Sequence, residues 1–149
     1  MKLPRLYPPV WFVANLGLLF AMRHFAPTPL ELPEVCPVIG RGLIWVGAAL
    51  SLAAIISFRI HHTSVLPFRT PHVLMRSGVY RWSRNPIYLG EAIILTGACL
   101  KFGHALPWLV LPFFIFGANR GFIAWEETTM RQKFGTVFDD YCRQTRRWL

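Results

Sequence analysis

Charged residues, and acidic ones above all, are scarce in this chain of 149 residues. Only 15 % of the residues are charged and 54 % are hydrophobic, which is too apolar for an ordinary soluble domain. Seven acidic residues stand against 16 lysines and arginines, so the formal net charge is +9. No nucleic-acid-binding motif accompanies the basic residues, and attraction to anionic lipid explains them better. We therefore expect an integral membrane protein with membrane lipid around it and no nucleic-acid partner.

Cysteine is also rare. Cys36, Cys99 and Cys142 are far apart in the chain and odd in number, which excludes a disulfide framework. His61 and His62 are adjacent, but no cysteine or carboxylate is spaced to complete a metal site with them. The sequence thus predicts no bound metal. Its length is enough for one domain, 1–149, and too short for two.

Four apolar segments are the main structural signal. A helix that crosses a membrane needs about 20 residues, and three of the four segments reach this length only with flanking residues. Residues 130, 134, 138 and 141 form an apolar stripe that predicts a further helix, which Gly135 should break or bend. We therefore expect an all-α integral membrane protein, with four spans followed by a cytoplasmic helix. The predicted spans are 8–24, 38–58, 86–103 and 105–125.

The arginines predict the topology. The loop between the second and third spans carries five arginines and no acidic residue, and the tail from Arg120 onward carries six basic residues. Basic loops remain in the cytoplasm, so both termini and this loop should face the same side. The chain then divides into two N-terminal spans, 1–58, and a second half, 59–149.

Two polar segments flank the last pair of spans. The first polar segment is residues 72–90, and the second polar segment is residues 125–135. Charged groups are expensive beside membrane spans, and the topology puts both segments on one side of the membrane. Together they predict one shared site at the cytoplasmic surface.

Several of these residues also have ordinary structural explanations. Asn85 precedes a proline, so it can cap the third span, and the same helix end can bind an anion. Glu91 lies about one turn inside that span, so it should either snorkel toward the membrane surface or pair, with Arg81 and Arg84 as the obvious partners. Glu126 and its neighbour Glu127 could be solvated charges at the start of a helix.

The order of three motifs resembles one enzyme family. Ser77-Gly-Val-Tyr80, Arg84-Asn-Pro-Ile-Tyr-Leu-Gly90 and Glu126-Glu with a later Phe134-Gly135 are similar to isoprenylcysteine carboxyl methyltransferases. These are integral membrane enzymes that use S-adenosylmethionine, and they are related to phospholipid methyltransferases. The resemblance covers about residues 59–149, and residues 63–67 also look like an upstream loop of the family.

The resemblance implies a set of site residues. Glu126 matches a glutamate that holds the amino group of the cofactor, and Arg120 lies about two residues from the family's substrate-orienting arginine. These two are the predicted catalytic residues. The predicted cofactor-binding residues are His72, Val73, Leu74, Met75, Gly78, Tyr80, Asn85, Pro86, Ile87, Tyr88, Gly90 and Glu126.

Departures from the family leave the acceptor open. Eukaryotic members have histidine at the position of Asn85, and they have more spans before the catalytic half. The Arg-Asn-Pro form is typical of the prokaryotic branch, which implies the inner membrane of a prokaryote. The acceptor could be an isoprenylcysteine-like carboxylate or another lipid O, N or S atom. A carboxylate needs only orientation, whereas a phenol or amine needs a base, for which Glu126 and His72 are the candidates.

Methyl transfer requires alignment of acceptor, methyl group and sulfur. The water-soluble cofactor should enter from the cytoplasm, and a lipophilic or lipidated acceptor should enter from the bilayer. Two other interpretations remain. A membrane reductase of the sterol-reductase type would bind NADPH instead. A non-catalytic membrane scaffold would not need Tyr80, Tyr88 and Glu126.

Overall fold

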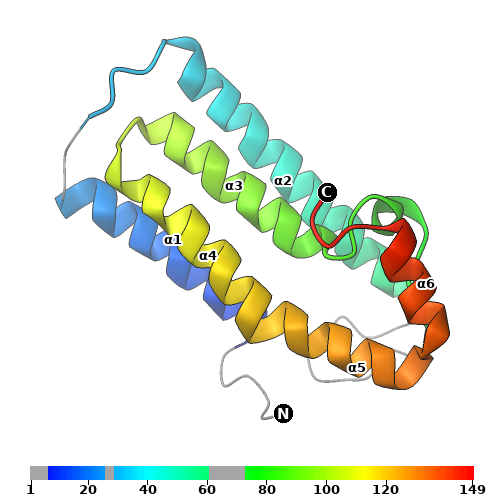
Figure 1. Ribbon diagram of the computed structural model, residues 1–149. Coiled ribbons are helices and arrows are strands. Elements are labelled where there is room, and N and C mark those ends of the chain that lie inside the picture. The colour runs from blue at the N-terminus through cyan, green and yellow to red at the C-terminus, as the bar shows by residue number, and fades with distance from the viewer. Residues whose placement is uncertain (1–6, 26–28, 61–72) are drawn as a thin grey trace.

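The computed structural model describes residues 7–25, 29–60 and 73–149. Within these ranges every long element is a helix, and the sole strand-like feature is an isolated bridge between Pro29 and His104. The long helical rods of the described residues lie side by side (Figure 1). They are α1 (Pro8–Phe25), α2 (Val35–Ile60), α3 (Pro86–Phe102) and a last rod that runs from residue 106 to residue 134.

The last rod combines different helix types without a break. A 3₁₀ turn, η2 (Leu106–Leu109), leads into α4 (Val110–Gly117), and α5 (Ala124–Phe134) ends the rod. Between them, η3 (Ala118–Ile123) is a π-helical segment. Such wider turns inside α-helices occur frequently at functional sites.

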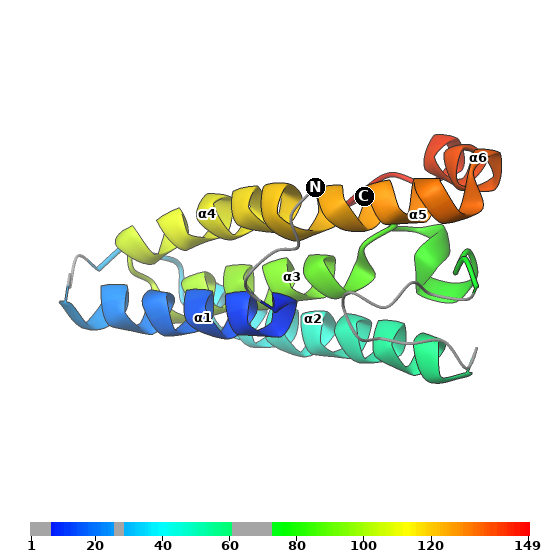
Figure 2. The ribbon, with the colours of Figure 1, turned by 90° about the horizontal axis from the view of Figure 1, so that it is seen from below.

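The chain turns sharply after the last rod, as the sequence predicted. Gly135 has a φ of 53°, which is left-handed backbone that glycine adopts without strain. It separates α5 from α6 (Thr136–Gln144), so the predicted break at Gly135 is confirmed. Figure 2 shows α6 at the end of the bundle where α3 begins, beside the short turn η1 (Gly78–Arg81).

Helices α2 and α3 contact each other through glycine. A Cβ atom added to Gly97 would lie 2.6 Å from the backbone oxygen of Gly40, and one added to Gly47 would clash with the backbone oxygen of Gly90. Only glycine lets the two backbones approach this closely, which is how many membrane helices associate. The start of α3 is therefore held firmly against α2.

The main core lies between α1, α3 and the last rod. Leu19, Leu95 and Phe114 are fully buried there, and the indole N–H of Trp11 donates to the Phe114 carbonyl at 3.3 Å. The outer face of α2 is different, because its Trp45 side chain is 76 % exposed.

Two described helices are long and apolar enough to cross a membrane, Val35–Ile60 and Leu106–Phe134. The apolar window of Val35–Ile60 is only 11 % buried inside the protein. An apolar helix so little covered by protein fits a membrane environment. The described part of the chain is thus helical with two candidate spans, and the remaining two predicted spans correspond to the shorter helices α1 and α3.

Candidate active site

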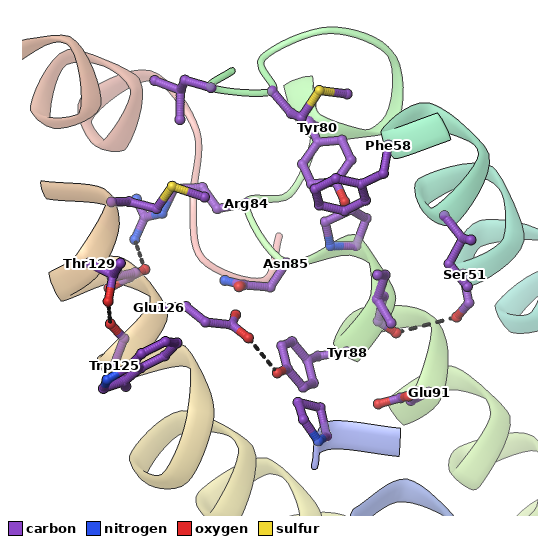
Figure 3. Close-up of a pocket in the computed structure, with 18 of the residues that line it drawn as sticks. Ser51, Phe58, Tyr80, Arg84, Asn85, Tyr88, Glu91, Trp125, Glu126 and Thr129 are labelled. Carbon is purple, nitrogen blue, oxygen red and sulfur yellow. Dashed lines mark hydrogen bonds and ion pairs between the residues drawn. The ribbon is translucent and has the colours of Figure 1, made fainter. Parts of the chain in front are cut away.

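A cavity of about 400 Å³ opens between the helices at the end where α3 begins. Its walls come from α1, α2, α3, α5 and α6 and from the chain that precedes α3, as Figure 3 shows in close-up. This volume lies in the range of pockets that bind small molecules. Both polar segments contribute side chains to it, so the predicted shared site has a physical space.

Tyr80 enters the cavity from the turn η1. Its side chain is buried, and its ring meets the ring of Phe58 edge to face with centroids 5.7 Å apart. The Tyr141 hydroxyl donates to the Tyr80 carbonyl at 2.6 Å, which ties α6 to this turn. Burial raises the pKa of the Tyr80 hydroxyl far above its ordinary value. This hydroxyl therefore keeps its proton and can donate a hydrogen bond.

A hydrogen bond between Tyr88 and Glu126 joins the two polar segments across the cavity. The Tyr88 hydroxyl on α3 donates to the Glu126 carboxyl on α5 at 3.0 Å (Figure 3). The Tyr88 ring also stacks on Phe122, with centroids 6.4 Å apart and planes 14° from parallel. These contacts hold Tyr88 from two sides, so the position of the Glu126 carboxyl is well defined.

The neighbouring carboxylate of Glu127 is bound quite differently. It forms ion pairs with Arg84 at 2.9 Å and with Arg147 at 2.5 Å. Arg84 also donates to the carbonyls of Cys142 and Thr145. Glu127 is therefore neutralised within the protein, and the expectation of solvated glutamates is wrong for it.

The expected pairing of Glu91 is also wrong. Arg84 is committed to Glu127 and to α6, while Arg81 is exposed. Glu91 is only 8 % exposed, and its Oε2 atom makes no hydrogen bond within the described residues. This carboxyl lines the cavity without an internal partner for that oxygen.

The C-terminal tail runs along the entry to α3. The Arg147 carbonyl accepts hydrogen bonds from the Asn85 amide at 3.1 Å and from the Ser83 hydroxyl at 3.2 Å. Asn85 occupies the N-cap position of α3, but its side chain makes no capping hydrogen bond. Its amide tethers the tail instead, which sequence reasoning did not anticipate.

The structure brings most of the predicted site residues together. Four do not line the cavity. Val73 is largely exposed, Gly78 begins η1 at a φ of 59°, Gly90 packs against α2, and exposed Arg120 has its guanidinium 5.9 Å from the Phe116 ring centroid. The predicted residue His72 lies outside the described residues. Those that line the cavity are Leu74, Met75, Tyr80, Asn85, Pro86, Ile87, Tyr88 and Glu126.

Other lining residues were not named individually as site residues. Some of them, such as Arg84 and Glu127, lie in the two polar segments and their motifs, so the expected shared site included them only as parts of a region. Others, such as Phe12 and Ser51, lie in the first two helices, where no motif singles them out. The polar and aromatic lining residues that were not named are Phe12, Ser51, Phe58, Arg84, Glu91, Trp125, Glu127, Thr129, Phe138 and Tyr141.

Known proteins resemble this chain over most of its length. A family model described as phospholipid methyltransferase matches residues 35–137, which include both polar segments. A probable protein-S-isoprenylcysteine O-methyltransferase of Oryza sativa subsp. japonica is 24 % identical over 136 residues, covering 87 % of this chain and 71 % of the rice protein. An uncharacterized protein of Haemophilus influenzae is 40 % identical over 63 residues, which are 42 % of this chain and all of that protein.

Proposed function

This chain belongs to the phospholipid methyltransferase family, and on that premise we propose that it transfers a methyl group from S-adenosylmethionine to a lipophilic acceptor. The match to the rice protein confirms the resemblance to isoprenylcysteine methyltransferases that the motifs indicated. Family membership and the two apolar helices support a membrane methyltransferase that acts on lipid-like substrates. What we propose beyond this is the donor, S-adenosylmethionine, and the lipophilic nature of the acceptor.

The hydrogen bond between Tyr88 and Glu126 is the observation that carries this proposal. It joins residues 38 positions apart, from two different helices, in the wall of a ligand-sized cavity within the matched range. A purely structural role would not require a half-buried carboxyl that faces a cavity, because removing such a group from water is costly.

The polar groups of the cavity suit S-adenosylmethionine, which supplies a methyl group on a positively charged sulfur when bound. Glu126 offers an acceptor for its ammonium group. The buried Nε of Arg84 has no hydrogen-bond partner within the described residues and could serve its carboxylate. Apolar residues such as Met75 and Phe58 offer surface for the adenine ring. The residues present therefore fit this cofactor.

We assign the protein's residues separate tasks. Glu126 holds the cationic amino group, Tyr88 orients Glu126, and Asn85 with Tyr80 offers hydrogen bonds at the cytoplasmic end. Aligning the reactants in this way is the main contribution an enzyme makes to such a displacement. Arg120 lies on the outside of the last rod, so it would orient an acceptor carboxylate only if that group approaches from there.

Family membership and the two apolar helices also support a proposal for the membrane arrangement. We propose four spans, with α1 and α3 beside the two longer helices and with both termini in the cytoplasm of a prokaryote. The acceptor would then reach the cavity from the bilayer. Single cysteines at exposed Arg81 and Lys133 test this topology, because a membrane-impermeant thiol reagent must modify both from the same side. Modification from opposite sides would contradict it.

Calorimetric titration of the purified protein tests the proposed function. We expect S-adenosylmethionine and its demethylated product to bind to one site, and NADPH not to bind. Binding of NADPH without binding of either sulfur compound would reject the methyltransferase and favour the reductase. Binding of none of the three would favour a scaffold.

A further inference from the structure

Glu91 is a buried carboxyl that the tasks proposed above leave unused. It lies on α3 at the wall of the cavity, and Figure 3 shows its carboxyl directed into that space on the far side of Tyr88 from Glu126. The side chain is 8 % exposed, and its Oε2 has no hydrogen-bond partner within the described residues. A carboxyl oxygen buried in this way is costly unless something donates a hydrogen bond to it.

No described side chain in the cavity wall supplies that donor. Arg84 is the only basic residue among the described lining residues, and its terminal nitrogens donate to Glu127 and to two carbonyls of the C-terminal region. The Ser51 hydroxyl donates to the Ile87 carbonyl at 3.3 Å. The missing donor is therefore expected on a bound molecule.

The position of Glu91 favours the acceptor over the cofactor as that molecule. The groups assigned to the cofactor, from Asn85 to Glu126, lie at the end of the cavity where α3 begins. Glu91 lies further along α3, and the cavity wall beyond it is apolar, with Phe12 of α1 and Ile94 of α3. A lipophilic molecule with one polar head group matches an apolar wall with a single polar atom.

We propose that Glu91 recognises the head group of the methyl acceptor by accepting a hydrogen bond from it. The acceptor is then a lipophilic amine or alcohol, because both carry a hydrogen-bond donor. A carboxylate is disfavoured, since it would bring a further negative charge toward Glu91 and Glu126, while Arg84, the only cation in the described wall, is already paired with Glu127. This inference rests on the proposed function, and it makes a carboxylate acceptor oriented by Arg120 the competing case.

Three probes with the same tail test the proposal: dodecylamine, dodecanol and dodecanoate. Their binding to the protein in lipid nanodiscs is measured by calorimetry, with empty nanodiscs subtracted to remove partition into lipid. We expect dodecylamine and dodecanol each to bind about tenfold more tightly than dodecanoate. This is the ratio of dissociation constants that one hydrogen bond to a charged group produces. The protein's net charge of +9 would favour dodecanoate, so this preference cannot arise from overall charge.

Variants then test whether the preference for dodecylamine and dodecanol over dodecanoate comes from Glu91. Glu91→Gln should reduce it to near unity, and Glu91→Asp, which retains the carboxyl, should restore part of it. Thr96→Val is a matched control, because it removes a hydroxyl from the same helix outside the cavity wall, where that hydroxyl donates to the Ala92 carbonyl. This control should retain the full preference.

The proposal is overturned if dodecanoate binds as tightly as the other probes, or if Glu91→Gln keeps the preference. It is also overturned if Glu91→Gln weakens binding of S-adenosylmethionine instead, which would make Glu91 a cofactor residue. The three probes on the unmutated protein remain decisive even if the variant does not fold. Titration of the unmutated protein with S-adenosylmethionine separates these results from a failure of the proposed function.

Discussion

The two faces of α3 contact their neighbours in opposite ways. Toward α2 the helix presents Gly90 and Gly97, whose backbone meets backbone with no room for a side chain. Toward the cavity it presents Tyr88 and Glu91, whose side chains reach across open space. This contrast explains how a small membrane protein can keep a cavity. Because one face of the helix is anchored by close contact, the other face can remain loosely packed and still be well positioned.

The largest expected effect comes from disturbing the anchored face. Gly97→Ala adds a methyl group that would lie 2.6 Å from the Gly40 oxygen, so α2 and α3 must separate. We expect the free energy of unfolding in detergent to fall by about 3 kcal/mol, the upper part of the range for overpacked interiors. Denaturant titration followed by circular dichroism measures this loss.

Gly17→Ala in α1 is the matched control, because an added Cβ there meets no atom within 4 Å. This variant should gain about 0.5–1 kcal/mol from better helix propensity. Equal stability of the two variants would mean that α3 is not anchored through its glycines.

The helices were predictable from sequence, and this anchoring was not. Apolar runs and Gly135 gave α1, α2, α3 and the break before α6 to within a few residues, but the last rod was predicted to end at residue 125 and continues to residue 134. Gly90 was predicted as a cofactor-binding residue, and its close contact with Gly47 of α2 was not predicted. Which face of one helix meets which face of another depends on packing between distant residues, and the local pattern does not encode it.

On the cavity face, substitutions of the two adjacent glutamates should have different effects, one on affinity for S-adenosylmethionine and the other on stability. Glu126→Gln removes the carboxylate proposed to hold the cofactor, so we expect S-adenosylmethionine to bind about 2 kcal/mol less tightly, with stability little changed. Glu127→Gln removes the shared partner of Arg84 and Arg147, so the free energy of unfolding should fall by about 2 kcal/mol. Calorimetry and denaturant titration of both variants measure these changes. A loss of affinity confined to Glu127→Gln would reverse the assignment.

A smaller effect is expected from removing the hydrogen bond that links α3 to α5. Tyr88→Phe removes the hydroxyl that donates to Glu126 and keeps the ring that stacks on Phe122. Stability should fall by about 1 kcal/mol, the usual worth of one hydrogen bond. Affinity for S-adenosylmethionine should also fall, because the Glu126 carboxyl loses its orientation. Unchanged affinity would show that Tyr88 supports the fold alone.

The sequence was informative about the site where residues are close in the chain. Tyr80, Asn85, Tyr88 and Glu126 were found through short motifs, and all four line the cavity. The ion pair between Glu127 and Arg147 could not be found in that way, because Arg147 belongs to the C-terminal tail and is brought to Glu127 only by the fold. Charge pairing was misjudged for the same reason, since Arg84 lies nearer to Glu91 in sequence yet binds Glu127.

The smallest expected effect concerns Asn85, which stands where the anchored and open regions meet. If Asn85 acted as a helix cap, serine would replace it with almost no loss of stability. The side chain instead donates to the Arg147 carbonyl, and the shorter serine does not extend as far. We therefore expect Asn85→Ser and Asn85→Ala to lose similar stability, about 0.5–1 kcal/mol each, and both to weaken S-adenosylmethionine binding.

Ser83→Ala separates the tether from the ligand role of Asn85. The Ser83 hydroxyl donates to the same Arg147 carbonyl at 3.2 Å and accepts from the Asn85 backbone N–H at 3.1 Å, but Ser83 does not line the cavity and its loss leaves the Asn85 amide in place. This variant should lose stability like the Asn85 variants and retain full cofactor affinity. Unfolding midpoints without cofactor, measured beside calorimetric affinities, distinguish the cases. If Ser83→Ala weakens cofactor binding as much as Asn85→Ser does, the docked tail shapes the cavity and Asn85 touches no ligand. If only the Asn85 variants lose affinity, its amide belongs to the cofactor site.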